Sequence, residues 1–348
     1  MIIAVGMSGG VDSSVAALLL KEQGCDVVGV TMKLWNGKYK GGDRDACFGA
    51  GEDKDIEDAA AIARSLGIEY RVFDCSAEYD RTIVSYFRET YLDGKTPNPC
   101  VFCNAMMKFG LLPRLAREAG LKFDRFATGH YARSAEIGGR HAILRAKDIS
   151  KDQSYFLYRL SQEQIARHVF PLGRMMKSEV REIARAHGIA SADKPDSQDF
   201  YSGEKEELIG EKDRPGDIVD LSGKVLARHS GFWRFTVGQR KGLGIGGGGV
   251  PYYVVAIDPC KNRVVVGSEE DAKSGSFRVK DVNWVSMAPT AEPFRCKVKV
   301  RSMGNMADAE FKDGECRFDG KVLGVAPGQS AVVYSPDGET LLCGGIIA

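Results

Sequence analysis

The first half of the chain alternates between short apolar runs and segments in which apolar residues recur at helical spacing. The apolar runs predict strands at 1–7, 26–32, 69–74 and 123–128. The helical spacing predicts helices at 15–21, 56–66, 79–91, 105–118 and 178–187. Strands that alternate with helices are typical of a parallel sheet that is covered by helices. We therefore predict an α/β domain over residues 1–204.

From about residue 214 the pattern changes to short apolar runs separated by glycine and proline. These runs predict strands at 216–220, 252–257, 263–266, 296–300 and 331–334. We therefore predict two small β-rich domains, a central one over 205–274 and a barrel-like one over 275–348. The glycine-rich run 241–249 is interpreted as a flexible connection or a binding loop, because no helical pattern follows it.

The composition, with 43% hydrophobic and 27% charged residues, is that of an ordinary globular protein. Neither a run of 18 apolar residues nor a signal peptide is found, so we expect a cytoplasmic protein without a membrane partner. The net charge of +1 is unevenly distributed, because residues 224–301 hold 14 Lys and Arg against 6 Asp and Glu. This stretch is expected to attract a polyanion. The alternative is a set of solvated lysines spread over a β domain.

Residues 8–14, Ser-Gly-Gly-Val-Asp-Ser-Ser, join the first predicted strand directly to a helix. Backbone N–H groups and the positive end of the helix dipole point at one place there, which suits a phosphate. The serine hydroxyls add donors, and Asp12 is a candidate ligand for a magnesium ion that bridges phosphates. The motif lacks the ending of a Walker loop and the spacing of a dinucleotide fold. It resembles the loop of the N-type ATP pyrophosphatases, and its alternative is a plain helix-capping turn.

Two of the nine cysteines stand in the segment Thr96-Pro-Asn-Pro-Cys-Val-Phe-Cys-Asn104. The prolines predict a turn before a helix, which places Cys103 near a helix N-terminus, where the pKa of a thiol is lowered. A Cys-x-x-Cys pair alone also fits half of a zinc site or a redox pair. Buried structural thiols are expected at Cys25, Cys75, Cys260, Cys296, Cys316 and Cys343.

Together these features resemble closely the family of the tRNA-specific 2-thiouridylases, over essentially the whole chain. The motifs that carry the resemblance are 6–14, 96–104, 127–133, 151–157, 170–173, 215–219, 236–244 and 326–329. The resemblance implies a tRNA-uridine 2-sulfurtransferase, which adenylates the 2-carbonyl oxygen of a wobble uridine with ATP and replaces it by sulfur, releasing AMP and pyrophosphate. The implied partners are a tRNA with a wobble uridine and a sulfur donor or sulfur-relay protein.

The same resemblance implies roles for single residues. It places ATP at Gly6, Met7, Ser8, Gly9, Gly10, Val11, Asp12 and Ser13, with Met32 and Gly129 beside the adenosine. It makes Cys103 the nucleophile, with Asn98, Pro99 and Cys100 around the target base. Contacts with tRNA are implied for His130, Lys151, Asp152, Gln153, Arg301 and Gln329. The alternatives are a hydrogen-bonded histidine at a strand end for His130 and a local cap for 151–153. Trp233 and Phe235 fit either a domain core or an RNA-binding surface.

Two positions depart from the family pattern. The family usually has a persulfide-bearing cysteine where this chain has Tyr201, and many members have aspartate where this chain has Cys100. Cys100 could replace the missing thiol and pair with Cys103. Alternatively, Cys47, Cys100 and Cys103 hold a [4Fe-4S] cluster with an open iron, or the chain is a tRNA-binding paralogue with decayed thiol chemistry. A rival enzyme, an ATP-dependent amide or argininosuccinate-type ligase, has no use for Cys103.

Overall fold

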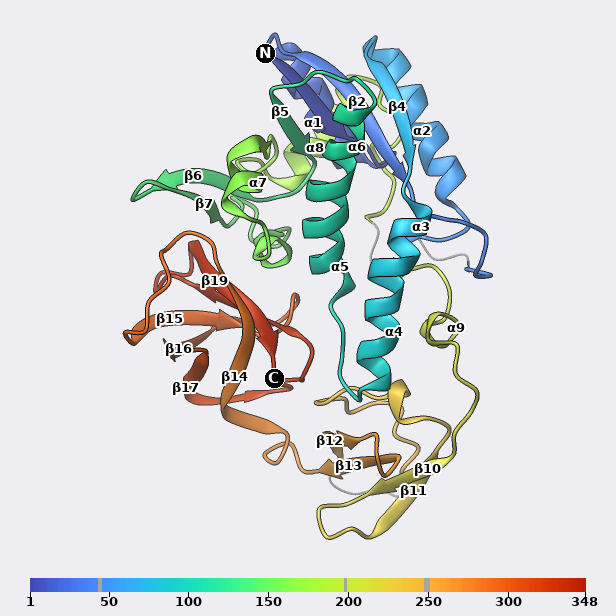
Figure 1. Cartoon of the computed structure of the whole chain (residues 1–348), viewed down its shortest axis with the longest axis vertical. Coiled ribbons are helices and arrows are strands. Elements are labelled where there is room, and N and C mark those ends of the chain that lie inside the picture. The colour runs from blue at the N-terminus through green and yellow to red at the C-terminus, as the bar shows by residue number, and fades with distance from the viewer. Residues whose placement is uncertain (43–45, 197–198, 247–250) are drawn as a thin grey trace.

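The structure is a computed structural model that describes residues 1–42, 46–196, 199–246 and 251–348 (Figure 1). Its first sheet is parallel and five-stranded, with the order β4-β2-β1-β5-β8. The strands are β1 (Ile2–Gly6), β2 (Asp26–Lys33), β4 (Glu69–Asp74), β5 (Arg125–Thr128) and β8 (His168–Val169). This sheet confirms the predicted α/β class.

The central strand β1 is buried on both faces, because helices cover both sides of the sheet. Ile3 and Val5 pack in one apolar cluster with α1 (Val11–Glu22), α2 (Glu52–Leu66) and α8 (Lys177–Ala186). Ala4, between them, packs on the opposite face against α6 (Leu112–Glu118). The alternation explains why the strand is a continuous apolar run in the sequence.

Two long helical rods run from the sheet towards the sheet formed by β10 to β13, which is described below (Figure 1). The first consists of α3 (Ser76–Tyr79), the π-helical segment η1 (Asp80–Val84) and α4 (Ser85–Leu92). The second consists of α5 (Pro99–Phe102), the π-helical segment η2 (Cys103–Leu111) and α6. This rod begins six residues before the predicted start at 105, with a proline in its first turn, where the missing N–H costs nothing.

Two further sheets follow, which confirms the prediction of two small β-rich parts. The strands of the first, in the order β11-β10-β13-β12, are β10 (Gly216–Val219), β11 (Val225–His229), β12 (Tyr253–Asp258) and β13 (Arg263–Gly267). The strands of the second are β14 (Lys273–Trp284), β15 (Phe294–Lys299), β16 (Ala307–Lys312), β17 (Glu315–Leu323), β18 (Ser330–Tyr334) and β19 (Thr340–Ile347). Pairing of β14 with β19 closes this second sheet into a barrel.

A hairpin from the first half of the chain extends the barrel sheet. It is formed by β6 (Arg133–Ile137) and β7 (Arg140–Leu144), and β7 pairs with β19. The barrel is therefore joined to the α/β part by main-chain hydrogen bonds. The remaining elements are β3 (Ala46–Phe48), η3 (Ser154–Leu157), α7 (Gln162–Arg167), β9 (Asp199–Tyr201), α9 (Lys205–Ile209) and η4 (Phe232–Arg234).

Burial decides several alternatives that the sequence left open. Trp233 and Phe235 are 2% and 6% exposed and belong to the core under the central sheet, so they form no RNA-binding surface. Cys75, Cys296, Cys316 and Cys343 are buried as predicted. Cys260 is exposed in the turn after β12 and Cys25 is half-buried after α1, so the prediction of buried thiols is wrong for these two.

Residues 247–249 of the glycine-rich run, and Ser197 and Gln198 before Tyr201, lie outside the described residues. Among the residues that the structure does describe, none of the helices combines the length and the apolar character that a membrane span requires.

His168 makes stability depend on pH. It is 5% exposed and packs against Phe109 and Phe126, with ring centroids 4.5 and 5.3 Å away. Burial lowers its pKa from 6.5 to about 4. Between these two pH values the unfolded chain binds the proton and the folded chain does not, so the free energy of unfolding falls as the pH falls.

We expect the free energy of unfolding of the wild type to fall by about 1.4 kcal/mol per pH unit more steeply than that of His168→Gln between pH 6 and 4.5. Urea unfolding at several pH values measures both slopes. Parallel slopes for the two proteins would contradict the shift of the His168 pKa.

Candidate active site

A cavity of about 330 Å³ lies at the carboxyl ends of β1, β2 and β5, the edge at which parallel sheets bind ligands. Of the residues singled out from the sequence, those that line it are Gly6, Met7, Ser8, Gly10, Val11, Asp12, Ser13, Met32, Cys47, Gly129, His130, Lys151 and Gln153. Those that do not line it are Gly9, Asn98, Pro99, Cys100, Cys103, Asp152, Arg301 and Gln329. The cavity thus brings together most of the expected ATP residues and one thiol.

The loop between β1 and α1 is shaped by close backbone approaches. Gly9 has φ +71°, and a Cβ there would lie 2.4 Å from the carbonyl oxygen of Asp55. A Cβ on Gly129 would lie 2.7 Å from backbone atoms of Asp12 and Ser13. Glycine at 129 lets the end of β5 lie directly against the first turn of α1, and glycine at 9 lets the loop lie against α2.

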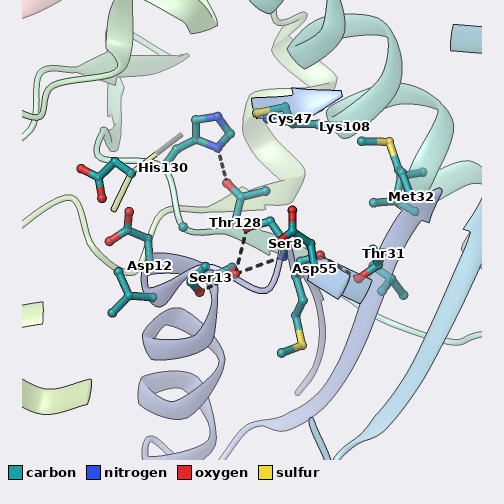
Figure 2. A pocket seen from close by; sticks show the side chains of 18 of the residues that line it. Ser8, Asp12, Ser13, Thr31, Met32, Cys47, Asp55, Lys108, Thr128 and His130 are labelled. Atoms are coloured by element: carbon teal, nitrogen blue, oxygen red, sulfur yellow. Dashed lines mark hydrogen bonds between the residues drawn. The ribbon is translucent and has the colours of Figure 1, made fainter. Parts of the chain in front are cut away.

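The first turn of α1 presents donors to the cavity. The first N–H groups of a helix have no partner within the helix. Gly10, which precedes α1, has no side chain that could cap them. The Ser8 amide donates to Ser13 Oγ at 3.1 Å, and the two hydroxyl oxygens are 3.3 Å apart (Figure 2). This arrangement suits the oxygens of a phosphate chain.

A network of alternating charges borders the loop. Lys177 Nζ lies 2.7 and 2.8 Å from the two carboxylate oxygens of Asp12 and 2.7 Å from Asp196. Asp196 also pairs with Lys151 at 2.7 Å, and the Tyr131 hydroxyl donates to Asp12 at 2.9 Å. Both Asp12 oxygens already contact an ammonium group, so the carboxylate is not arranged as a metal ligand here. The magnesium role of Asp12 stays a prediction.

Lys177 is a residue that the sequence reasoning missed, and its charge is strongly buried, with 9% of the side chain exposed. Lys177→Met leaves Asp12 and Asp196 without their shared counter-ion and is expected to lower the free energy of unfolding by about 2–3 kcal/mol. Asp12→Asn in the same protein should restore about 1 kcal/mol of that loss. Urea unfolding of the two single variants and the double variant measures this coupling, and strictly additive losses would contradict it.

The thiols of the Cys-x-x-Cys pair lie beside the cavity without lining it. Cys103 is buried and Cys100 is half-buried. Burial raises the pKa of Cys103 to about 11 and that of Cys100 to about 12, so the predicted lowering at a helix N-terminus is wrong for this structure. The reason is that α5 begins at Pro99, which places Cys103 a full turn inside the rod and away from solvent.

The same rod reaches the cavity at Lys108. Burial by itself lowers the pKa of Lys108, but the nearby thiols of Cys47, Cys103 and Cys100 outweigh it and leave the pKa raised. No carboxylate lies within ion-pair distance of Lys108 in the described part of the chain. Figure 2 shows Lys108 beside Cys47, across the cavity from Ser8 and Ser13. The sequence offered no signal for Lys108 beyond its place in the helix that follows the thiols.

A cluster of iron and sulfur needs three thiols on one side of a small space. Within residues 1–42, 46–196, 199–246 and 251–348 no group of three or more His, Cys, Asp or Glu side chains is placed to hold a metal ion. The residues present therefore do not fit a cluster held by Cys47, Cys100 and Cys103, and no chemical step is derived through one.

Several residues with an implied tRNA contact hold the cavity wall together. His130 Nδ1 is 2.8 Å from Thr128 Oγ1, and burial, with a further effect of Lys108, keeps its pKa well below the usual value. Gln153 Oε1 accepts the Tyr131 amide at 2.9 Å. The Asp152 side chain is 1% exposed and braces the turn before η3 through local hydrogen bonds. Asp152 is therefore placed as a local cap, whereas Lys151 and Gln153 contact Asp196 and Tyr131, and the tRNA contacts of these residues stay a prediction.

The barrel holds the turn that precedes the Cys-x-x-Cys pair. Gln329 Nε2 donates to the Pro97 carbonyl at 2.9 Å, and the Thr96 amide donates to the Pro327 carbonyl at 2.8 Å. Asn98 is 7% exposed within this turn. Arg301 instead lies at the barrel surface, where Nε donates to the Gly324 carbonyl at 3.1 Å. Gln329 therefore supports the turn from which the thiol-bearing rod begins.

Comparison with known proteins covers nearly the whole chain. Three family models match successive parts of the chain. They are described as the tRNA methyl transferase HUP domain, at residues 1–201, the tRNA methyl transferase PRC-barrel domain, at 206–268, and the Aminomethyltransferase beta-barrel domain, at 274–347. The tRNA-specific 2-thiouridylase MnmA of Endomicrobium trichonymphae is 43% identical and covers 100% of this chain and 99% of its own length. That of Chloroflexus aurantiacus is 44% identical and covers 99% and 98%.

Solved structures resemble the chain only distantly. A 4-thiouridine synthetase in complex with RNA and ATP is 17% identical, with a TM-score of 0.37 over 58% of this chain and 44% of that one, and this likeness carries no argument. The full-length relatives and the family models decide the matter: the chain belongs to the family of the tRNA-specific 2-thiouridylases.

Proposed function

We propose that this chain replaces the 2-oxygen of a wobble uridine in tRNA by sulfur and uses ATP to turn that oxygen into a leaving group. A uracil carbonyl is a poor electrophile, and its oxygen cannot leave as such. Attack of that oxygen on the α-phosphorus of ATP forms a bond to AMP and releases pyrophosphate. Sulfur then attacks the ring carbon, and AMP leaves with the oxygen.

One observation carries this proposal: the loop that suits a phosphate chain and a thiol line the same cavity. Loop residues 6–8 and 10–13 form one part of its wall, and Cys47 and Lys108 form another. A ligase for amides or argininosuccinate shares the loop but needs no thiol beside it. The family membership supports the same assignment.

The placement of ATP in this proposal follows the residues of the cavity. The N-terminus of α1 and the hydroxyls of Ser8 and Ser13 bind the phosphates. Met32 and Gly129 border the adenosine, and both line the cavity. The ammonium groups of Lys177 and Lys151, which pair with Asp12 and Asp196, lie at the edge of the loop, where pyrophosphate leaves.

The tRNA in this proposal is held by the β-rich parts as well as by the cavity. Of the 14 basic residues between 224 and 301, six lie in ion pairs. Exposed cations outside any ion pair of the described residues are Lys224, Arg240, Lys241, Arg263, Arg278, Lys280 and Arg301. Such charges suit a phosphate backbone. The base must leave its stack to reach the cavity.

We also propose the division into domains 1–204, 205–274 and 275–348. The three sheets support it, since the parallel sheet, the central sheet and the barrel fall largely into these ranges. The family models, at 1–201, 206–268 and 274–347, have similar limits.

The test is an assay of the full chain with ATP, a tRNA that has a wobble uridine, and either sulfide or a persulfide donor. We expect pyrophosphate release that depends on the tRNA, and 2-thiouridine in the digested tRNA by mass spectrometry. A matched tRNA with cytidine at the wobble position should give neither. Pyrophosphate release without any need for tRNA would contradict the proposal and favour a ligase. Binding of tRNA without any turnover would favour the decayed paralogue.

A further inference from the structure

Cys47 is the thiol of the candidate site that both solvent and substrate can reach. It is exposed and lines the cavity, whereas Cys103 is buried, Cys100 is half-buried, and neither lines it. A group that takes sulfur from a donor protein and passes it to a base must be open on both sides. Of these three thiols, Cys47 alone satisfies both conditions.

Cys47 also lies next to the position at which the chain departs from its family. The strand β3 pairs in parallel with β9, with Phe48 opposite Tyr201. Because side chains alternate along a strand, Cys47 points away from the face that Phe48 and Tyr201 share. Tyr201 packs against Phe48 and Trp35, with ring centroids 5.8 and 6.4 Å away, and its hydroxyl donates to Glu207. A thiol at 201 would therefore lie in an aromatic cluster, while Cys47 faces the cavity.

Lys108 supplies the positive charge that an anionic sulfur needs. It lies beside Cys47 at the cavity (Figure 2) and forms no ion pair with a described carboxylate. It acts on the buried thiol as well, because its charge opposes the rise that burial causes in the pKa of Cys103. One ammonium group therefore serves the exposed thiol and the buried one.

We propose that Cys47 carries the transferable sulfur in this chain, in place of the cysteine that the family usually has at position 201, and that Cys103 releases the product. Lys108 is a positioning residue that holds the anionic sulfur at the cavity. The inference rests on the proposed 2-thiolation and assigns its sulfur to a residue.

The chemistry balances with a persulfide donor and a dithiol reductant. The Cys47 thiolate attacks the outer sulfur of the donor, a Cys47 persulfide forms, and the donor leaves as a thiol. The terminal sulfur of this persulfide then attacks the AMP-activated carbon, the carbon–oxygen bond breaks and AMP leaves. The Cys103 thiolate attacks the Cys47 sulfur and frees the 2-thiocarbonyl. The resulting disulfide between Cys47 and Cys103 is reduced by two electrons from the dithiol.

The experiment uses the full chain, with glutathione persulfide as the sulfur source and the tRNA assay described above. After loading, the thiols are alkylated and the peptides are analysed by mass spectrometry. We expect the extra sulfur on the Cys47 peptide of the wild type. Cys47→Ser should form at least about a hundredfold less 2-thiouridine, while its tRNA-dependent pyrophosphate release continues. Cys260→Ser, which removes another exposed thiol, should behave like the wild type.

The positioning role of Lys108 has its own readout. Lys108→Met is expected to slow sulfur loading of Cys47, and Lys108→Arg should restore much of the rate, because it keeps the charge. A loss that Lys108→Arg does not relieve would overturn the electrostatic role.

Extra sulfur on Cys100 instead of Cys47, or normal 2-thiouridine formation by Cys47→Ser, would overturn the inference. So would iron and labile sulfide that bind the wild type and are lost from Cys47→Ser. If the wild type releases no pyrophosphate in response to tRNA, the proposed function itself fails. If that release is intact and sulfur does not load Cys47, only the present inference fails.

Discussion

Cys103→Ser is expected to release pyrophosphate from ATP in response to tRNA and to form at least about a hundredfold less 2-thiouridine than the wild type. Activation of the carbonyl needs the loop and its charge network, which Cys103 does not contact. Formation of free 2-thiouridine needs a second thiol, because sulfur bound to the base must be separated from its carrier. Pyrophosphate release on mixing and nucleoside mass spectrometry measure the two steps separately.

The Cys103→Ser variant needs a matched control, because Cys103 is buried and a hydroxyl in place of a buried thiol destabilises many proteins. Cys316→Ser makes the same exchange in the barrel core, far from the cavity in the chain's architecture. Thermal unfolding should show a comparable loss of stability for both variants, and only Cys103→Ser should lose thiolation. If Cys103→Ser thiolates tRNA normally, Cys103 is not the thiol that frees the product.

Gly129→Ala should have the largest effect on the ATP half of the reaction. The new methyl group would lie 2.7 Å from backbone atoms of Asp12 and Ser13. Backbone cannot rotate aside, so the first turn of α1 must move away from the end of β5. Displacements of this size commonly cost about a hundredfold in rate, and we expect that loss in tRNA-dependent pyrophosphate release, together with at least about tenfold weaker ATP binding measured by calorimetry.

Gly51→Ala is the matched control for this prediction. Gly51 precedes α2 with φ −79°, and a Cβ there meets nothing within 4 Å. This variant should bind ATP as the wild type does. Wild-type ATP binding by Gly129→Ala would mean that the phosphates do not lie at the first turn of α1.

The parts of the site that could be predicted from the sequence are those built from neighbouring residues. The loop at 6–13 combines a strand end, glycines and a helix start within one short segment, so its shape depends on local backbone geometry. The end of α2 was predicted for the same reason, because Gly67 takes the left-handed conformation, with φ +61°, that stops the helix. The short strands β3 and β9 escaped prediction, since three residues each hold too little pattern.

The sequence by itself determined the fold class, the loop between the first strand and the first helix, the Cys-x-x-Cys pair and the resemblance to the family. Only the tertiary structure decided which groups meet. Lys177 is 165 residues away from Asp12 in the chain, and Gln329 is 232 residues away from Pro97. It also decided that Cys47 faces the cavity and that Cys103 is buried. The physical reason is that helix caps, turns and periodicity depend on near neighbours, whereas burial, charge pairing and hydrogen bonds between distant residues depend on how the whole chain closes around the cavity.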